Sequence, residues 1–197
     1  MGQTRKEPLL MPIIGGTHME LTEAAASRRS IRAYKKGTTV EQSTVEEIIK
    51  FAQQAPSWKN SQTGRYYVVI SPEKLAAVKE NCLPEFNRNN CIDAPVLIVS
   101  TFVKTRAGFN REGVPDNELG DKWGAYDLGL QNAYLVLKAR ELGLDTLIMG
   151  IRDGEALRKE LDIPETEDVA SVISLGYRDI DPEMPKRKDV EAITKFF

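Results

Sequence analysis

The chain has 197 residues, of which 41% are hydrophobic and 28% charged, the composition of a soluble globular protein with one full core. Its 27 basic and 29 acidic residues give a formal net charge of −2, so no overall positive field would attract a nucleic acid. Two cysteines are too few for a zinc ribbon or an iron–sulfur cluster. The single histidine, His18, precedes the predicted domain, which argues against a Ser-His-Asp triad. No stretch is long enough to span a membrane, so we expect a cytoplasmic protein with neither a nucleic-acid nor a membrane partner.

Residues 1–18 are predicted to form an N-terminal tail that is disordered or not native to the chain. Their apolar patch, residues 9–14, contains a proline and is followed by two glycines. Neither its length nor its flanks are those of a signal peptide. A single domain is therefore expected over residues 19–197.

A short helix is predicted over residues 20–27, and the arginines that follow are expected to end it. Overlapping capping boxes within residues 43–47 predict the start of a second helix. Its apolar residues recur at helical spacing up to Pro56, which is expected to stop it. The loop that follows, residues 56–62, is rich in side chains that form hydrogen bonds.

Residues 65–70 are apolar in succession and are predicted to form a central strand, covered on both faces. Ser71 and Pro72 are typical of a helix start, with the serine as cap. Residues 96–100 predict a second buried strand. The polar, glycine-bearing segment 105–119 predicts a long loop of the kind that often covers a binding site.

The longest helix is predicted over residues 123–142, where a broad apolar face indicates a helix enclosed by its neighbours. A strand, a helix and a strand are predicted next, at residues 145–149, 153–161 and 169–175. A tail from 178 to 197 ends the chain. Strands and helices alternate irregularly and no glycine-rich phosphate loop is present, so neither a Rossmann fold nor a P-loop is predicted.

The densest chemical feature is the segment 27–32, Ser-Arg-Arg-Ser-Ile-Arg, which holds three guanidinium groups and no acid. Arginine donates parallel hydrogen bonds to two oxygens at once, so the segment predicts a site for a small anion such as a phosphate monoester. A second basic cluster, at residues 186–188, lies in the tail. The alternatives are an exposed basic loop for the first cluster and a solvated run of charges for the second.

Several further stretches stand in a distinctive order after the first arginine cluster. They are Ala55-Pro56-Ser57 followed by Asn60 and Gln62, Asp93-Ala94-Pro95, Leu142-Gly143-Leu144, Met149-Gly150, and Leu175-Gly176-Tyr177 before the basic tail. Each alone is weak, but the ordered set resembles the nitroreductase family of flavin enzymes over nearly the whole domain.

The resemblance implies an α+β fold with a small mixed central sheet flanked by helices. It also implies an intertwined homodimer whose C-terminal tail extends over the partner. FMN is the expected cofactor, bound in a cleft at the subunit interface. NAD(P)H and a small electron acceptor are the expected substrates.

The resemblance assigns the phosphate end of FMN to the arginine cluster. Arg28, Ser30 and Arg32 are expected to hold the phosphate and the ribityl chain. Arg29 is expected to contribute beside the ring or through its backbone. Arg187, from the tail, would complete the phosphate clamp.

The flavin ring is assigned to two other stretches. Residues of the loop after the second helix are expected at the polar edge of the ring: Pro56, Ser57, Asn60 and Gln62. Asn60 would come from the partner subunit and bond the pyrimidine edge. The backbone N–H of Gly150 would face flavin N5. Met149, which precedes it, is also expected to bind the cofactor. It stands where some members of the family carry a glutamate, so no carboxylate role is assigned there.

Several of these residues have structural alternatives. Asn60 can instead cap the turn before a strand. Gly150 and Gly176 can be turn glycines that need a positive φ. Cys82 and Cys91 are interpreted as ordinary reduced thiols, with a redox role as the other option.

The predicted function is transfer of hydride from NAD(P)H, through flavin N5, to a nitroaromatic, a quinone or a similar acceptor by a ping-pong mechanism. No catalytic side chain is assigned, because the flavin carries the chemistry. Reductive dehalogenation, enoyl reduction and destruction of the flavin remain open within the same fold. A protein that binds FMN or phosphate without turnover is the alternative of another class. Trp58 and the loop 105–119 are expected to border the substrate, or else to pack on the surface.

Overall fold

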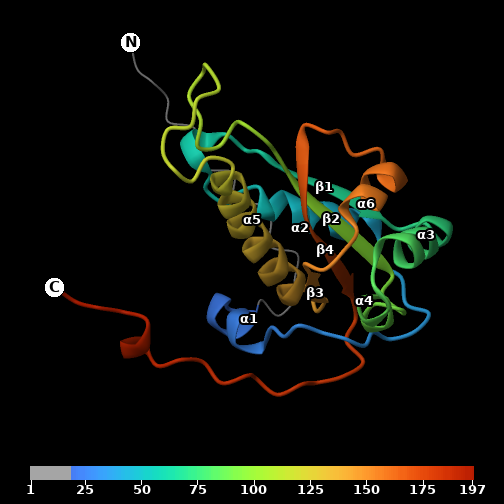
Figure 1. Ribbon diagram of the computed structural model, residues 1–197. Coiled ribbons are helices and arrows are strands. Elements are labelled where there is room, and N and C mark those ends of the chain that lie inside the picture. Colours follow the sequence, from blue (N-terminus) through green and yellow to red (C-terminus); the bar gives the residue numbers. More distant parts are fainter. Residues whose placement is uncertain (1–18) are drawn as a thin grey trace, which may run out of the picture.

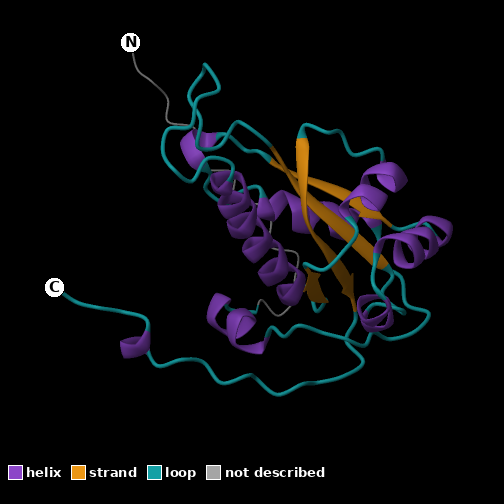
Figure 2. Ribbon diagram, viewed as in Figure 1, coloured by secondary structure: helices purple, strands orange, loops and turns teal. Residues whose placement is uncertain are grey.

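A four-stranded sheet with the strand order β1-β2-β4-β3 lies in the middle of the fold (Figures 1 and 2). The structure is a computed structural model that describes residues 19–197, so the predicted tail, residues 1–18, lies outside the described residues. The strands are β1 (Gly64–Val69), β2 (Val96–Val103), β3 (Asp145–Met149) and β4 (Glu167–Gly176). The helices are α1 (Leu21–Ser27), α2 (Gln42–Ala52), α3 (Pro72–Cys82), α4 (Glu85–Asn90), α5 (Lys122–Glu141) and α6 (Gly154–Leu161), with 3₁₀ turns η1 (Trp58–Asn60) and η2 (Val190–Ala192).

Helices cover both faces of the sheet, because successive residues of β2 point to opposite sides. Leu97 and Val99 belong to one hydrophobic cluster, with side chains of α3 and α6. Val96 and Ile98 belong to the other, with side chains of α2 and α5. The predicted buried strand at residues 96–100 is therefore confirmed, and β2 runs on to Val103.

β1 lies at the edge of the sheet, so the prediction of a central strand at residues 65–70 is wrong. The reason lies in its tyrosines, whose rings are apolar but whose hydroxyls need polar partners. The Tyr66 hydroxyl donates to Asn132 Oδ1 at 3.1 Å, and the Tyr67 hydroxyl donates to Glu167 Oε2 at 3.1 Å. An edge position leaves room for these half-buried side chains.

The sheet is antiparallel at each of its three strand pairings, where a mixed sheet was expected. Within residues 19–197, the one parallel pairing is an isolated bridge between Ser30 and Thr146. That bridge lays the arginine cluster along the free edge of β3.

The helix starts were predicted with mixed success. The capping boxes at residues 43–47 do not form, because Glu41 is the N-cap of α2 and makes no side-chain cap bond. Ser71 does cap α3, and its hydroxyl accepts from the Lys74 N–H at 3.4 Å. Asp153 caps α6 by accepting from the Ala156 N–H at 2.9 Å.

α5 matches the predicted longest helix, and its inner side is buried. Its outer side is bare in the single chain, where Tyr126, Gly129 and Ala133 are exposed. The chain itself therefore covers only one side of the helix that was predicted to be enclosed by its neighbours. Among residues 19–197, no helix combines the length and apolar character needed to cross a membrane.

Candidate functional site

The arginine segment, residues 28–32, leaves α1 in extended conformation and lies beside β3. α1 ends at Ser27, and Arg28 has β-region backbone angles. The Ile31 N–H donates to the Thr146 carbonyl at 3.0 Å, so the segment continues the sheet for one bridge. Its backbone is therefore held in place by β3.

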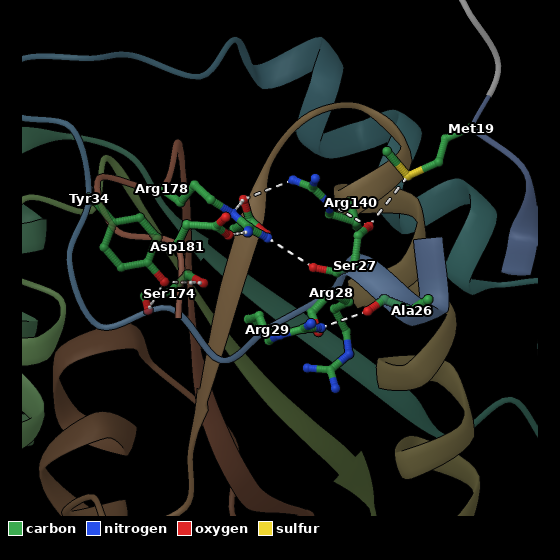
Figure 3. A network of polar contacts seen from close by, with 11 residues as sticks. Met19, Ala26, Ser27, Arg28, Arg29, Tyr34, Arg140, Ser174, Arg178 and Asp181 are labelled. Atoms are coloured by element: carbon green, nitrogen blue, oxygen red, sulfur yellow. Dashed lines mark hydrogen bonds and ion pairs between the residues drawn. The ribbon is translucent and has the colours of Figure 1, made fainter. Parts of the chain in front are cut away.

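A network of ion pairs and hydrogen bonds around Asp145 joins the end of α1 to β3, α5 and the start of the tail (Figure 3). The Asp145 carboxylate, whose side chain is fully buried, accepts from Arg178 Nε at 2.7 Å and from Arg178 Nη2 at 2.6 Å. Arg178 Nη2 also donates to the Ser27 carbonyl at 3.1 Å. Arg140 Nη1 lies 3.3 Å from Asp145 Oδ2, and its Nε donates to Ser27 Oγ at 3.0 Å. The hydrogen bond to Asp145 raises the pKa of Arg178, which keeps this guanidinium charged.

Beside the segment lies a hollow of about 420 Å³, the Arg28 hollow. It is bounded by the segment, β3 and the outer side of α5, and its lining residues are Arg28, Ser30, Gly129, Asn132, Ala133, Val136, Thr146 and Ile148. The Arg28 side chain points away from the Asp145 network (Figure 3). No carboxylate of residues 19–197 pairs with it, so its charge is available to a ligand.

The other predicted arginines are placed differently. Arg29 is turned onto its own chain, where Nη1 donates to the Ala26 carbonyl at 2.7 Å and to the Arg28 carbonyl at 2.8 Å. Arg32 and Arg187 are exposed and do not line the hollow. A single chain therefore brings Arg28 and Ser30 together at the hollow. Arg32 lies next to Ser30, with Nη1 donating to the Ser30 carbonyl at 3.4 Å, but it stays outside the lining, as does Arg187.

The Asn60 loop, residues 56–62, has a strained backbone. Lys59, Asn60 and Gln62 have φ values of 46°, 55° and 48°, in the left-handed region that disfavours side chains with a Cβ. Such strain costs about 1–3 kcal/mol per residue and is concentrated at functional sites. Within the loop, the Gln62 N–H donates to Ser57 Oγ at 3.1 Å and Gln62 Nε2 donates to Asn60 Oδ1 at 3.2 Å. Pro56, at the start of the loop, is exposed.

Asp127 of α5 holds the Asn60 loop by a hydrogen bond to the loop backbone. Its Oδ2 accepts from the Trp58 N–H at 2.9 Å, and the residue is 3% exposed. Burial raises the pKa of Asp127, and the hydrogen bond from Trp58 opposes that effect. Sequence reasoning missed this residue, although an aspartate within an apolar helical stripe was a visible signal.

We expect Asp127→Asn to make the slope of unfolding free energy against pH more positive, because it removes a contribution that falls as the pH rises. Because the pKa is raised in the fold, the native state binds this proton more tightly than the unfolded chain. The contribution of Asp127 to the free energy of unfolding should then fall as the pH rises above the ordinary aspartate pKa of about 3.9. Asparagine keeps an oxygen acceptor for Trp58 and removes the charge. Urea unfolding across a pH series measures the slope.

The control is Asp189→Asn, which removes an exposed carboxylate from the tail. It should leave the slope as in the wild type. An unchanged slope in Asp127→Asn would show that Asp127 does not contribute as described.

The Asn60 loop and the Arg28 hollow are separate surfaces of one chain. Gln62 lines a different hollow, with Gln131 and Tyr66, and the two hollows share no lining residue. The residues predicted to bind the phosphate and the ring edge are thus not brought together within one subunit.

The predicted ring contact at the end of β3 is accessible. Met149 is 2% exposed, whereas Gly150, which follows it, is exposed. Gly150 does not have a positive φ, and a Cβ added to it would meet nothing within 4 Å. The alternative of a positive-φ turn glycine is therefore wrong for Gly150. It is wrong for Gly176 too, where a Cβ would lie 2.7 Å from Pro95 Cδ and close packing is the reason for glycine.

The two cysteines do not form a disulfide, and both are buried. Burial raises the pKa of Cys82 and of Cys91 to about 11, so both remain protonated thiols at neutral pH. This environment is that of structural cysteines and matches the interpretation as ordinary reduced thiols.

Comparison with known proteins identifies the family. The sequence model of the nitroreductase family matches residues 25–90 and 81–177. The chain belongs to the nitroreductase family. The family predicted from the sequence, and the oxidoreductase class that it implies, are confirmed.

Individual nitroreductase-family proteins resemble the chain over most of its length. A protein of Archaeoglobus fulgidus named as an NADH dehydrogenase/NAD(P)H nitroreductase is 29% identical over 160 residues, which are 77% of this chain and 81% of that protein. A solved structure from Exiguobacterium sibiricum, described as a nitroreductase in complex with FMN, has a TM-score of 0.82 at 21% identity and covers 93% of this chain and 100% of that one. An enone reductase of a gut-bacterial fatty acid saturation metabolism has a TM-score of 0.78 at 20% identity, with 90% and 97% covered. The two structures share the fold with this nitroreductase-family chain.

The residues at the Arg28 hollow fit FMN, the cofactor that family membership supports. The free Arg28 guanidinium suits a phosphate, and the Ser30 and Thr146 hydroxyls suit a polyol. Ile148, 48% exposed at the same hollow, offers an apolar surface to a flat ring.

Proposed function

We propose that this nitroreductase-family chain is an FMN-dependent NAD(P)H oxidoreductase in which two copies enclose each FMN. The single observation that carries the proposal is the guanidinium of Arg28, which lines the Arg28 hollow and has no carboxylate partner within residues 19–197. The backbone of its segment is held by the hydrogen bond from Ile31 to Thr146 of β3. When bound, FMN supplies hydride transfer, so the protein needs no catalytic acid, base or nucleophile. The proposal includes a ping-pong exchange, in which nucleotide and acceptor would occupy the same site in turn.

The chain's own residues bind and orient the cofactor. Arg28 and Ser30 hold the phosphate and the ribityl chain. Gly150, which has no side chain to obstruct approach, presents its N–H to the ring. Asn60 and Gln62 of a second copy meet the polar edge of the ring, held at their unusual backbone angles by the loop's own hydrogen bonds.

The exposed side of α5 supports the second copy. Gly129 sits in the middle of the helix, where glycine costs about 1 kcal/mol relative to alanine, and a Cβ there would meet nothing within 4 Å. Close approach of a partner backbone explains such a glycine. Tyr126, one turn away, is 59% exposed. In the tail, which runs clear of the sheet in Figure 1, Phe196 is 91% exposed, as expected of a segment that extends over a partner.

The acceptor is a small, flat, reducible molecule such as a nitroaromatic or a quinone. The enone reductase that shares the fold keeps enoyl reduction as an alternative. Fold alone does not select among these acceptors.

The test uses purified chain, FMN, NADH or NADPH, and a panel of nitroaromatic, quinone and enone acceptors. We expect a yellow protein that oxidises the nucleotide faster than free FMN does. Protein that takes up no FMN would contradict the proposal. Protein that takes up FMN but leaves the nucleotide unoxidised would instead favour the non-catalytic binding protein.

A further inference from the structure

Another hollow, the basic pocket, lies between the Asn60 loop and the loop that joins β2 to α5. Its volume is about 450 Å³. Its lining contains three cations and two aromatic residues but no carboxylate. These five residues are Lys59, Arg106, Arg111, Trp58 and Phe109.

The walls of the basic pocket are tied together by specific contacts. Lys59 Nζ forms an ion pair with Asp116 at 2.7 Å, which joins the two loops. Asn110 Oδ1 accepts from the Glu112 N–H at 3.1 Å and from the Val114 N–H at 2.8 Å. The long loop is therefore folded on itself, which holds the backbone that carries Arg106 and Arg111.

The positive charge of the pocket is only partly neutralised. Asp116 compensates Lys59. Arg106 and Arg111 are exposed, and no carboxylate within residues 19–197 forms an ion pair with either. Two uncompensated guanidinium groups at one pocket favour an anion there, because each donates a planar fork of hydrogen bonds.

The aromatic wall is fixed as well. The Trp58 ring packs against Trp123, with 4.6 Å between the ring centroids. Trp123 Nε1 donates to Asn117 Oδ1 at 2.9 Å, which fixes that ring in turn. Trp58 is therefore held in one orientation, with Lys59 Nζ 5.5 Å from its ring centroid, and the ring together with this cation suits a planar anionic group. Asn60 also lines the pocket and connects it to the proposed edge of the flavin.

From this combination we infer that the basic pocket binds the anionic group of the electron acceptor, and that the acceptor is an aromatic acid such as an aryl carboxylate. The inference rests on the proposed function for the reaction itself. It assigns specificity to Arg106 and Arg111, with Trp58 and Phe109 flanking the ring of the acid. Neither arginine takes part in hydride transfer.

Tryptophan fluorescence tests binding without any turnover. The chain has two tryptophans; Trp58 lines this pocket, and Trp123 packs against Trp58. We expect benzoate to change their emission with an affinity about tenfold higher than that of benzamide, its neutral counterpart, because hydrogen bonds to charged groups supply that difference. In the double variant Arg106→Gln, Arg111→Gln the two affinities should become equal. Lys36→Gln, which removes an exposed charge from a turn outside the pocket, should keep the preference.

Steady-state kinetics then show whether the pocket binds the anionic group of the acceptor or that of the nucleotide. In the double variant the KM for 4-nitrobenzoate should rise about tenfold, and the KM for 4-nitrobenzamide should not change. Equal binding of benzoate and benzamide by the wild type would overturn the inference. So would a double variant that weakens NADPH and leaves benzoate binding unchanged, since the anion site would then serve the nucleotide. If no nucleotide is oxidised at all, the proposed function fails, while benzoate binding still decides whether the pocket recognises aromatic acids.

Discussion

Arg28→Ala is expected to weaken FMN binding about 100-fold, because a bidentate guanidinium–phosphate contact contributes about 3 kcal/mol. Arg28 is the predicted phosphate ligand that already lies at the hollow and has no carboxylate partner within residues 19–197. Arg28→Ala removes both the positive charge and the paired N–H donors of the guanidinium, without disturbing a contact that holds the fold. Titration of FMN fluorescence gives the affinity directly.

Two further variants separate the possible causes of that loss. Arg28→Lys keeps the charge but loses the fork, and we expect an intermediate loss of about tenfold. Arg88→Ala removes an arginine that pairs with Glu80 and does not line the hollow, and it should bind FMN as the wild type does. If Arg28→Ala binds FMN as tightly as Arg88→Ala, the phosphate lies elsewhere.

Asp145→Asn is expected to lower the free energy of unfolding by about 3 kcal/mol, because it leaves two partly buried arginines without their buried carboxylate. The Asp145 side chain is fully buried, and those of Arg178 and Arg140 are 18% and 20% exposed. Breaking this network also frees the Ser27 carbonyl, so the arginine segment should lose part of its support. Urea unfolding of the protein without FMN measures the stability term alone.

Asp181→Asn is the matched control, because Asp181 also pairs with Arg178, at 2.6 Å. Its side chain is 86% exposed, so the pair is solvated and its loss should cost less than about 1 kcal/mol. Equal losses in the two variants would mean that burial at Asp145 contributes nothing.

Features set by neighbouring residues could be predicted from the sequence. Ser71 is the predicted cap of α3, and its bonding partner is three residues away, although the same spacing at residues 43–47 forms no cap. The arginine cluster was visible because its charges are consecutive. Even so, only Arg28 and Ser30 of that cluster line the hollow.

Features that depend on distant pairing could not be predicted in the same way. An apolar run such as that of β1 has the same sequence pattern whether the strand lies at the edge or in the centre of a sheet, because strand order is set by the other strands. The Asp145 network joins α1, α5, β3 and the start of the tail, and no spacing in the sequence reveals it. The strain at Lys59 and Asn60 was hidden because neither residue is a glycine.

The FMN site shared between two copies is tested most directly by complementation between two impaired variants, Arg28→Ala and Asn60→Ala, produced together in one cell. If each FMN site takes Arg28 from one copy and Asn60 from the other, a mixed dimer contains one site with both residues intact. At an FMN concentration too low to load either variant alone, we predict that the co-produced pair regains FMN binding and nucleotide oxidation. A mixed preparation as inactive as its parents, with mixed dimers present, would contradict a site shared between two copies.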